Sequence, residues 1–135
     1  MFLLVLAFPA ASGAAGEAGR VRVVAWASAP TKAGLPPADA VSGGTYCKAR
    51  AIAKLYAFVR FRGMRDKVSS SATWRFNKKK VLVFNFRWED GDSGRTAFNL
   101  HRTKGALAEG VYSIQIRTGG TLVGKGTVRL EFGAC

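Results

Sequence analysis

The chain has 135 residues, of which 21 are lysine or arginine and 8 are acidic, giving a formal net charge of +13. This length supports one compact domain with a single core. The positive charge favours anionic partners or a generally cationic, solvated surface. One histidine and two cysteines are too few for a histidine–cysteine metal cluster.

The chain begins with an apolar run followed by small residues, MFLLVLAFPAASGAAG, with no charge before Glu17. This pattern is typical of a secretory signal that lacks its basic first segment, with cleavage between Ala11 and Gly16. A buried N-terminal strand or helix is the alternative. A transmembrane anchor is not expected, because the run is shorter than the roughly 20 residues that span a bilayer. We expect residues 1–15 to be a signal peptide and the protein to be secreted, periplasmic or at the cell envelope, without a transmembrane segment.

Residues 20–27, RVRVVAWA, form a candidate strand, and residues 28–44 are rich in Pro, Gly and Ala, which is typical of an extended linker. The sequence leaves open whether this strand joins the domain or belongs to a tether. We therefore divide the chain into an N-terminal strand and linker over residues 16–46 and a folded domain over residues 47–135.

Short stretches with an apolar period of two follow at regular spacing. Period two gives a strand one buried and one solvated face, and the pair Gly119–Gly120 supplies the positive φ of a tight hairpin turn. The expected strands lie within residues 53–62, 71–76, 81–88, 95–101, 111–118 and 121–132. This spacing predicts an all-β, antiparallel β-sandwich of about seven strands. Its expected core is Leu55, Val59, Trp74, Phe84, Phe98, Tyr112, Ile114, Leu122, Val128 and Leu130.

Trp74 and Tyr112 resemble the core tryptophan and corner tyrosine of immunoglobulin-like domains. The chain from residue 52 to 132 resembles a bacterial extracytoplasmic immunoglobulin-like module of the kind appended to secreted proteases. The motifs that carry this resemblance are LYAFVRFRGMRD, SATWRF, FRWEDGDSGRTAFNL, GALAEGVYSIQI and TLVGKGTVRL. The resemblance implies an immunoglobulin-like sandwich and brings no catalytic residue. Two turns depart from the family pattern, because no glycine follows Asp66 and the lysine-rich NKKK replaces a turn that commonly has Asp or Gly.

The two cysteines, Cys47 and Cys135, bracket the predicted sandwich. An even number of cysteines in an exported protein predicts a disulfide between them. The alternative is two free thiols, with Cys135 reaching another chain.

The sequence offers little for catalysis or cofactor binding. It has no nucleophile elbow and no phosphate-binding loop, and the single histidine, His101, falls on the outer face of its strand. The acidic cluster Glu89, Asp90 and Asp92 has fewer oxygen ligands than Ca²⁺ requires and is typical of an exposed turn. We therefore predict a protein that is not an enzyme and has no cofactor.

The most distinctive predicted surface is basic and aromatic. Aromatic rings between cations suit stacking on sugars or bases, together with neutralisation of phosphates or carboxylates. The alternatives are that the aromatic rings are covered and that the lysine run is a solubilising hairpin tip. The candidate anion-binding residues are Lys54, Arg60, Arg62, Lys78, Lys79 and Lys80, and the candidate stacking residues are Tyr56 and Phe58.

These features favour a secreted, non-catalytic binding or accessory module at the cell envelope. Its expected partners are an anionic envelope polymer or another secreted protein, with nucleic acid bound only nonspecifically. The alternative is a small secreted protease inhibitor that presents the loops at residues 63–71 and 102–110. Those loops are polar and unbraced, which favours the binding module.

Overall fold

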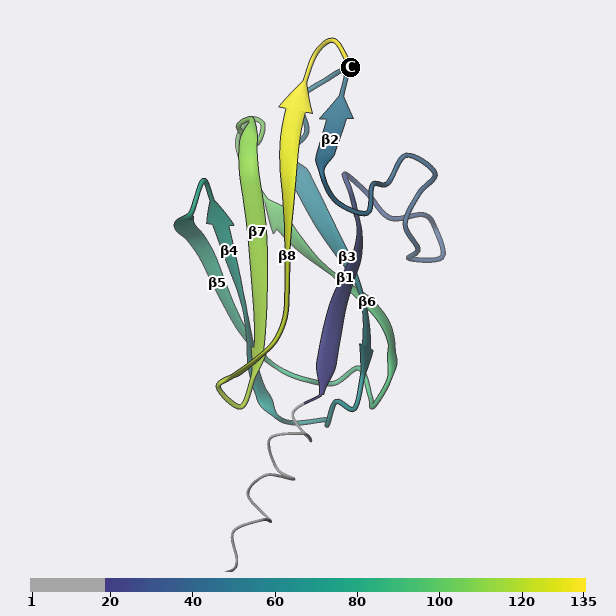
Figure 1. Cartoon of the computed structure of the whole chain (residues 1–135), viewed down its shortest axis with the longest axis vertical. Coiled ribbons are helices and arrows are strands. Elements are labelled where there is room, and N and C mark those ends of the chain that lie inside the picture. The colour runs from purple at the N-terminus through teal and green to yellow at the C-terminus, as the bar shows by residue number, and fades with distance from the viewer. Residues whose placement is uncertain (1–18) are drawn as a thin grey trace, which may run out of the picture.

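The computed structural model describes residues 19–135, and the predicted signal peptide lies outside the described residues. A three-stranded sheet, in the order β1-β3-β6, faces a five-stranded sheet, in the order β2-β8-β7-β4-β5 (Figure 1). Within this range no helix is long and apolar enough to cross a membrane. The strands are β1 (Arg20–Ala27), β2 (Thr45–Lys48), β3 (Lys54–Arg62), β4 (Ser69–Phe76), β5 (Lys79–Arg87), β6 (Gly94–His101), β7 (Gly110–Thr118) and β8 (Thr121–Phe132).

The predicted all-β sandwich is confirmed, and the structure adds two features. β1 pairs with β3 over its whole length, so the strand at residues 20–27 joins the sandwich, which therefore begins before residue 47. β2, which the sequence analysis treated as the end of a linker, pairs with β8 in parallel. The remaining strand pairs are antiparallel.

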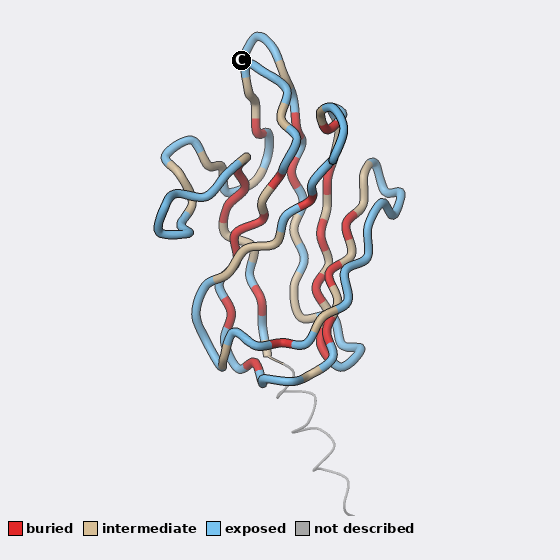
Figure 2. The backbone as a smooth tube through the Cα atoms, turned by 180° about the vertical axis from the view of Figure 1, so that it is seen from behind, coloured by how far each residue is buried: buried red, intermediate tan, exposed pale blue. Residues whose placement is uncertain are grey.

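The core lies between the two sheets and is built around two tryptophans. Trp26 of β1 meets Trp74 of β4 edge-on, with ring centroids 6.1 Å apart, and each is only 1% exposed. Buried residues recur along the strands of both sheets, as the red segments of Figure 2 show. Most of the predicted core is confirmed, in Leu55, Val59, Trp74, Tyr112, Ile114, Val128 and Leu130.

Two predicted core residues are wrong, and a third is only partly buried. Phe84 is 53% exposed because β5 is the outermost strand of its sheet. Leu122 is 40% exposed because it lies beside the Gly119–Gly120 turn, beyond the covered part of the hairpin. Phe98 is half-buried on β6, which is the outer strand of the other sheet.

One side of the sandwich is closed by glycines of β8. A Cβ atom at Gly124 would lie 2.9 Å from the Cβ of Val21, and one at Gly126 would lie 2.9 Å from the Cβ of Val23. These positions therefore exclude side chains, and β8 passes directly against β1. The opposite side, between β5 and β6, has no such closure in the described chain.

The corner before the final hairpin is fixed by Tyr112. Its hydroxyl donates a hydrogen bond of 2.7 Å to the carbonyl oxygen of Ala108, four residues upstream. The tyrosine corner of immunoglobulin-like sandwiches has the same kind of contact. Burial raises the pKa of Tyr112, because the charged phenolate would lose solvation there.

Candidate anion-binding site

Five arginines share the outer side of the three-stranded sheet. In β1 and β3, apolar residues that enter the core alternate with arginines, and side chains alternate between the two sides of a strand. Residues that are paired directly across antiparallel strands point to the same side, so the register places these arginines together. We call the set of Arg20, Arg22, Arg60, Arg62 and Arg95 the arginine face.

The arginine face consists of two rows of like charge. Arg60 is paired directly with Arg22 on one side and with Arg95 on the other. In the second row, Arg62 is paired with Arg20. Like charges directly opposite each other destabilise a sheet. All five arginines are exposed, and within residues 19–135 none of them has an acidic or hydrogen-bonding partner.

An open hollow of about 1040 Å³ runs along β1 and takes in the whole arginine face. Lys125 of β8 adds a sixth cation to its lining, and Leu122 of β8, which is 40% exposed, adds apolar surface. The site therefore offers guanidinium groups from three strands and an ammonium group from the facing sheet. Guanidinium groups bind phosphates and carboxylates through paired N–H donors, so this arrangement suits an anion that carries several such groups.

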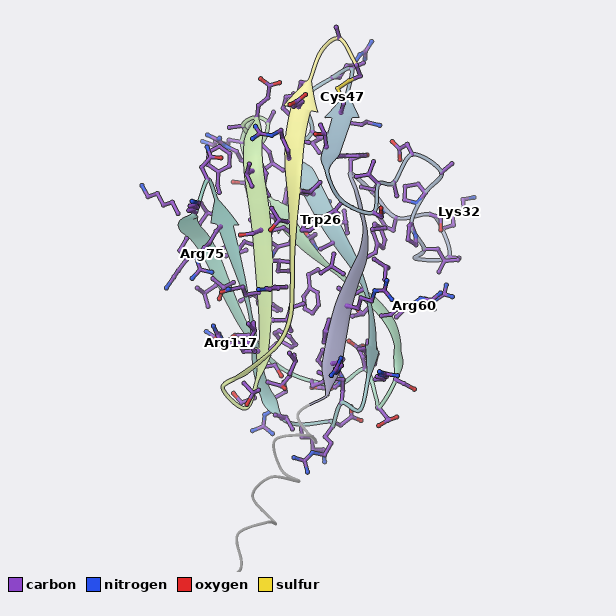
Figure 3. All side chains as sticks on the ribbon, viewed as in Figure 1. Trp26, Lys32, Cys47, Arg60, Arg75 and Arg117 are labelled. Atoms are coloured by element: carbon purple, nitrogen blue, oxygen red, sulfur yellow. A yellow bond between two sulfur atoms is a disulfide. The ribbon has the colours of Figure 1, made fainter. Side chains whose placement is uncertain are left out.

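The outer side of the five-stranded sheet is also basic, but its charges are differently placed. Arg75 donates a hydrogen bond of 2.6 Å to the side-chain oxygen of Gln115, and Arg117 is paired with Ser71. Figure 3 shows Arg60 on one side of the sandwich and Arg75 and Arg117 on the other. Direct arginine–arginine pairing is thus a property of the three-stranded sheet among the described residues.

The predicted site residues on β3 are only partly brought together. Arg60 and Arg62 belong to the arginine face, but Lys54 lies at the opposite end of β3, where it is paired with His101. Tyr56 is half-buried between them. Phe58 is only 3% exposed, so its prediction as a stacking residue is wrong. Its ring packs with the buried core residues and against the ring of Tyr56, at a centroid distance of 6.0 Å.

The lysine run belongs to a different part of the molecule. Lys78 lies in the turn between β4 and β5, and Lys79 and Lys80 begin β5, the outer strand of the other sheet. The structure therefore separates these lysines from the arginine face. Arg20, Arg22 and Arg95 were not among the predicted site residues, because they join the site only through the pairing of β1 and β6 with β3. The alternation RVRV at residues 20–23 was the available signal for two of them.

The linker is held in place by polar contacts at Tyr46. The Tyr46 hydroxyl donates to the Asp39 carboxylate at 3.1 Å and accepts a hydrogen bond of 3.0 Å from the backbone N–H of Ser28. The Lys48 ammonium donates to the same carboxylate at 2.6 Å and holds the pKa of Asp39 below its usual value. Cys47 and Cys135 form a disulfide, so β2 is also joined covalently to the segment that follows β8.

The other predicted features are solvent-exposed or serve the fold. His101 is exposed on β6. The acidic turn is tied to the loop between β3 and β4 by a hydrogen bond of 2.9 Å from the Gly91 N–H to the Asp66 carboxylate. In the described part of the chain, no three His, Cys, Asp or Glu side chains are grouped as metal ligands.

The two loops considered for protease inhibition lie at opposite ends of the sandwich. β3 and β6 are antiparallel, with Lys54 paired with His101 and Phe61 with Gly94. The loop after β3 and the loop after β6 therefore leave the sheet in opposite directions. They do not form one continuous inhibitory surface.

No known family model matches the chain, and no curated protein matches it. Among solved structures, it is similar to the CARDB domain of a Pyrococcus furiosus protein, crystallised in complex with di-metal ions. The two share 12% sequence identity at a TM-score of 0.41, over 84% of this chain and 93% of that one. The fold and the candidate site described above rest on the strands and side chains of this chain itself.

Proposed function

We propose that this protein is a secreted, non-catalytic binding module that holds an anionic polymer of the cell envelope on its arginine face. The observation that supports this most is the direct cross-strand register of Arg22, Arg60 and Arg95 without carboxylate partners in the described chain. Such a row destabilises the sheet on its own. A bound polyanion would neutralise it and offset that cost.

The dimensions of the face favour a repeating ligand over a single small anion. Neighbouring strands lie about 4.8 Å apart, and alternate residues along a strand lie about 6.7 Å apart. The two arginine rows thus present a grid of donors within an open hollow. A flexible chain with regularly placed phosphates or carboxylates can engage several of these donors at once, whereas a single anion reaches only a few of them.

The Cys47–Cys135 disulfide supports an oxidising compartment, where such bonds persist. Polymers of the envelope that carry phosphate or carboxylate are the anions that an exported protein meets. Nucleic acid shares the same phosphate chemistry, and we expect it to bind without sequence preference. Each phosphate contact on duplex DNA would then contribute a log–log salt slope of about −0.9.

The test compares two triple variants that lose the same charge. R22Q/R60Q/R95Q removes the row of three arginines from the arginine face. K78Q/K79Q/K80Q removes three exposed lysines from the β4–β5 hairpin of the other sheet. Retention on immobilised teichoic acid and on heparin is measured from low to high salt. We expect the arginine variant to lose most of its retention and its salt slope, while the lysine variant stays close to the parent.

Two results would overturn the proposal. Equal losses in both variants would show that net charge alone, rather than the arginine face, governs retention. No salt-sensitive retention of the parent on either polymer would show that the arginine face does not bind polyanions.

A further inference from the structure

The outer strand β5 carries apolar side chains that the fold leaves uncovered. In the described chain β5 pairs with β4 alone, so its other edge presents backbone N–H and C=O groups without strand partners. Figure 2 shows this arm of the hairpin in pale blue along most of its length. The exposed fractions of four consecutive side chains lie between 40% and 53%, at Val81, Leu82, Val83 and Phe84.

The inner side of this strand borders an apolar cleft. Leu82 and Phe84 of β5 and Phe98 of β6 line a cavity of about 210 Å³ at the side where the two sheets separate. The rings of Phe84 and Phe86 stack at 5.3 Å, and Phe86 meets Phe98 at 5.7 Å. The free edge and the cleft are therefore adjacent, so an added strand could pair with β5 and place alternate side chains in the cleft.

Sheet edges are commonly protected from pairing by lysines and bulges. β5 has both at its first end, where Lys79 and Lys80 precede a bulge at Val81. From Leu82 to Phe86, however, the only polar side chain is Asn85. Arg87 adds a charge at the other end, so the protection is confined to the two ends of the strand and the apolar part between them stays open to pairing.

The charges at the two ends indicate which partner would fit. Lys79 and Lys80 lie at one end of the apolar run and Arg87 at the other. If a second copy of the chain paired antiparallel along β5, the lysines of each copy would lie near Arg87 of the other. Each copy also carries a formal charge of +13, so the two copies repel each other. Like charges opposed across strands are destabilising, so self-pairing is disfavoured.

We propose that the free edge of β5 docks an extended segment of another protein, with alternate apolar residues in its centre and carboxylates at both ends. The backbone of this segment would continue the five-stranded sheet. Its inward apolar side chains would enter the cleft beside Phe84 and Phe98, and its carboxylates would meet Lys79, Lys80 and Arg87. This interaction is independent of the arginine face, which lies on the other sheet.

The first experiment uses a nine-residue peptide with two glutamates at each end and alternating valine and threonine between them. Binding to the full chain is measured by fluorescence anisotropy at low salt. We expect saturable binding that weakens severalfold when the glutamates are replaced by glutamines. Equal affinity of the acidic and the neutral peptide would overturn the charge assignment.

Backbone pairing is tested on the peptide, so the fold of the protein is untouched. Two forms of the peptide carry N-methyl groups at alternate positions of the central residues. In an extended strand, only one set of alternate N–H groups faces the sheet, so one form should lose binding and the other should keep it. Equal behaviour of the two forms would overturn pairing along the β5 edge.

The side-chain contribution is tested with Phe84→Ser and a matched control, Leu35→Ser. Both residues are exposed, at 53% and 38%, and Leu35 lies in the linker, away from β5. We expect Phe84→Ser to weaken peptide binding about tenfold, as loss of one apolar anchor does, and Leu35→Ser to leave it unchanged. Concentration-dependent dimerisation of the parent that Phe84→Ser abolishes would overturn the proposal in favour of a second copy.

Discussion

Arg60 lies between Arg22 and Arg95, so its guanidinium is repelled from both sides. Replacing it with threonine, a good strand former, should relieve two like-charge pairs and raise the free energy of unfolding by about 0.4–2 kcal/mol. The same variant should lose polyanion retention. A gain in stability with a loss of binding is the signature of a charge kept for its ligand.

Urea unfolding at low and high salt measures this effect, which should shrink as salt screens the repulsion. Arg117→Thr is the control, because Arg117 is paired with Ser71 and has no arginine opposite. If Arg60→Thr lowered stability at low salt, the row would be held by contacts other than those described.

The burial of the Tyr112 phenol predicts that the folded state loses stability at alkaline pH. Burial raises its pKa, so the folded state holds the phenol proton more tightly than the unfolded chain. The stability that this contributes is fully present below the ordinary pKa of 10.0 and falls as the pH rises through the raised value. Tyr112→Phe should lack this decline. It should also lose about 1 kcal/mol at neutral pH with the Ala108 hydrogen bond. Urea midpoints across the alkaline range would check both effects.

The burial of single residues was predictable on some strands and not on others. Alternation correctly assigned the inner residues of β3, β4 and β7, because these strands lie within their sheets and are covered on the inner side. Phe84 and Phe58 were misjudged for opposite reasons. Phe84 sits on an outer strand with an open flank, while Phe58 is covered although it lies on the outer side of β3. Whether a neighbouring segment covers a side chain is decided by tertiary packing, which the period of one strand does not report.

At the level of the elements, the β4–β5 hairpin is joined by two residues with left-handed backbone. Asn77 has a φ of 48° and Lys78 a φ of 73°, which matches the turn that is usually built from Asn-Gly. Lysine is strained in this conformation by roughly 1–2 kcal/mol, whereas glycine is not. Lys78→Gly should therefore raise the free energy of unfolding, by up to about 1 kcal/mol after the added flexibility of the unfolded chain is counted.

Thermal unfolding of Lys78→Gly beside Lys79→Gly provides the comparison. Lys79 lies in the strand without positive φ, so glycine there should be destabilising. A lower melting temperature for Lys78→Gly would contradict the strain assigned to this turn.

The final hairpin was predictable because its Gly119–Gly120 turn and the apolar period of two on both sides of it indicate the same structure. β2 was not, because it has only four residues and follows a stretch rich in Pro and Gly. Its parallel pairing with β8 joins segments far apart in sequence, and Tyr46 is buried there although no repeating pattern surrounds it.

For the whole molecule, the sequence predicted the sandwich and the disulfide partners but left the site incomplete. The arginine face needs three strands in register, and only one of them was assigned to it from the sequence. The Cys47–Cys135 disulfide closes a loop with a sequence separation of 88. Chain-entropy reasoning gives a contribution of about 4 kcal/mol for a loop of this length.

Cys47→Ser/Cys135→Ser should thus lower the free energy of unfolding by up to about 4 kcal/mol, while polyanion retention at low temperature persists. Denaturant unfolding of the variant beside the reduced and oxidised parent would measure this. A stability equal to that of the oxidised parent would mean that the bond contributes nothing to the fold.

The position of this disulfide also decides how the module would respond to tension. The start of β1 and the C-terminus lie at opposite ends of the molecule (Figure 1). If it were pulled at residue 19 and residue 135, the force would pass through the Cys47–Cys135 disulfide, and the chain between these two cysteines would not be stretched. Only residues 19–46 could extend, to a span of about 95 Å at most. Because β1 is antiparallel to β3 along its whole length, force along its axis would shear their hydrogen bonds together instead of peeling them one by one. β1, which carries Arg20 and Arg22, is thus the strand that would detach first under load. A polymer bound across β1, β3 and β6 would raise the force needed to detach it.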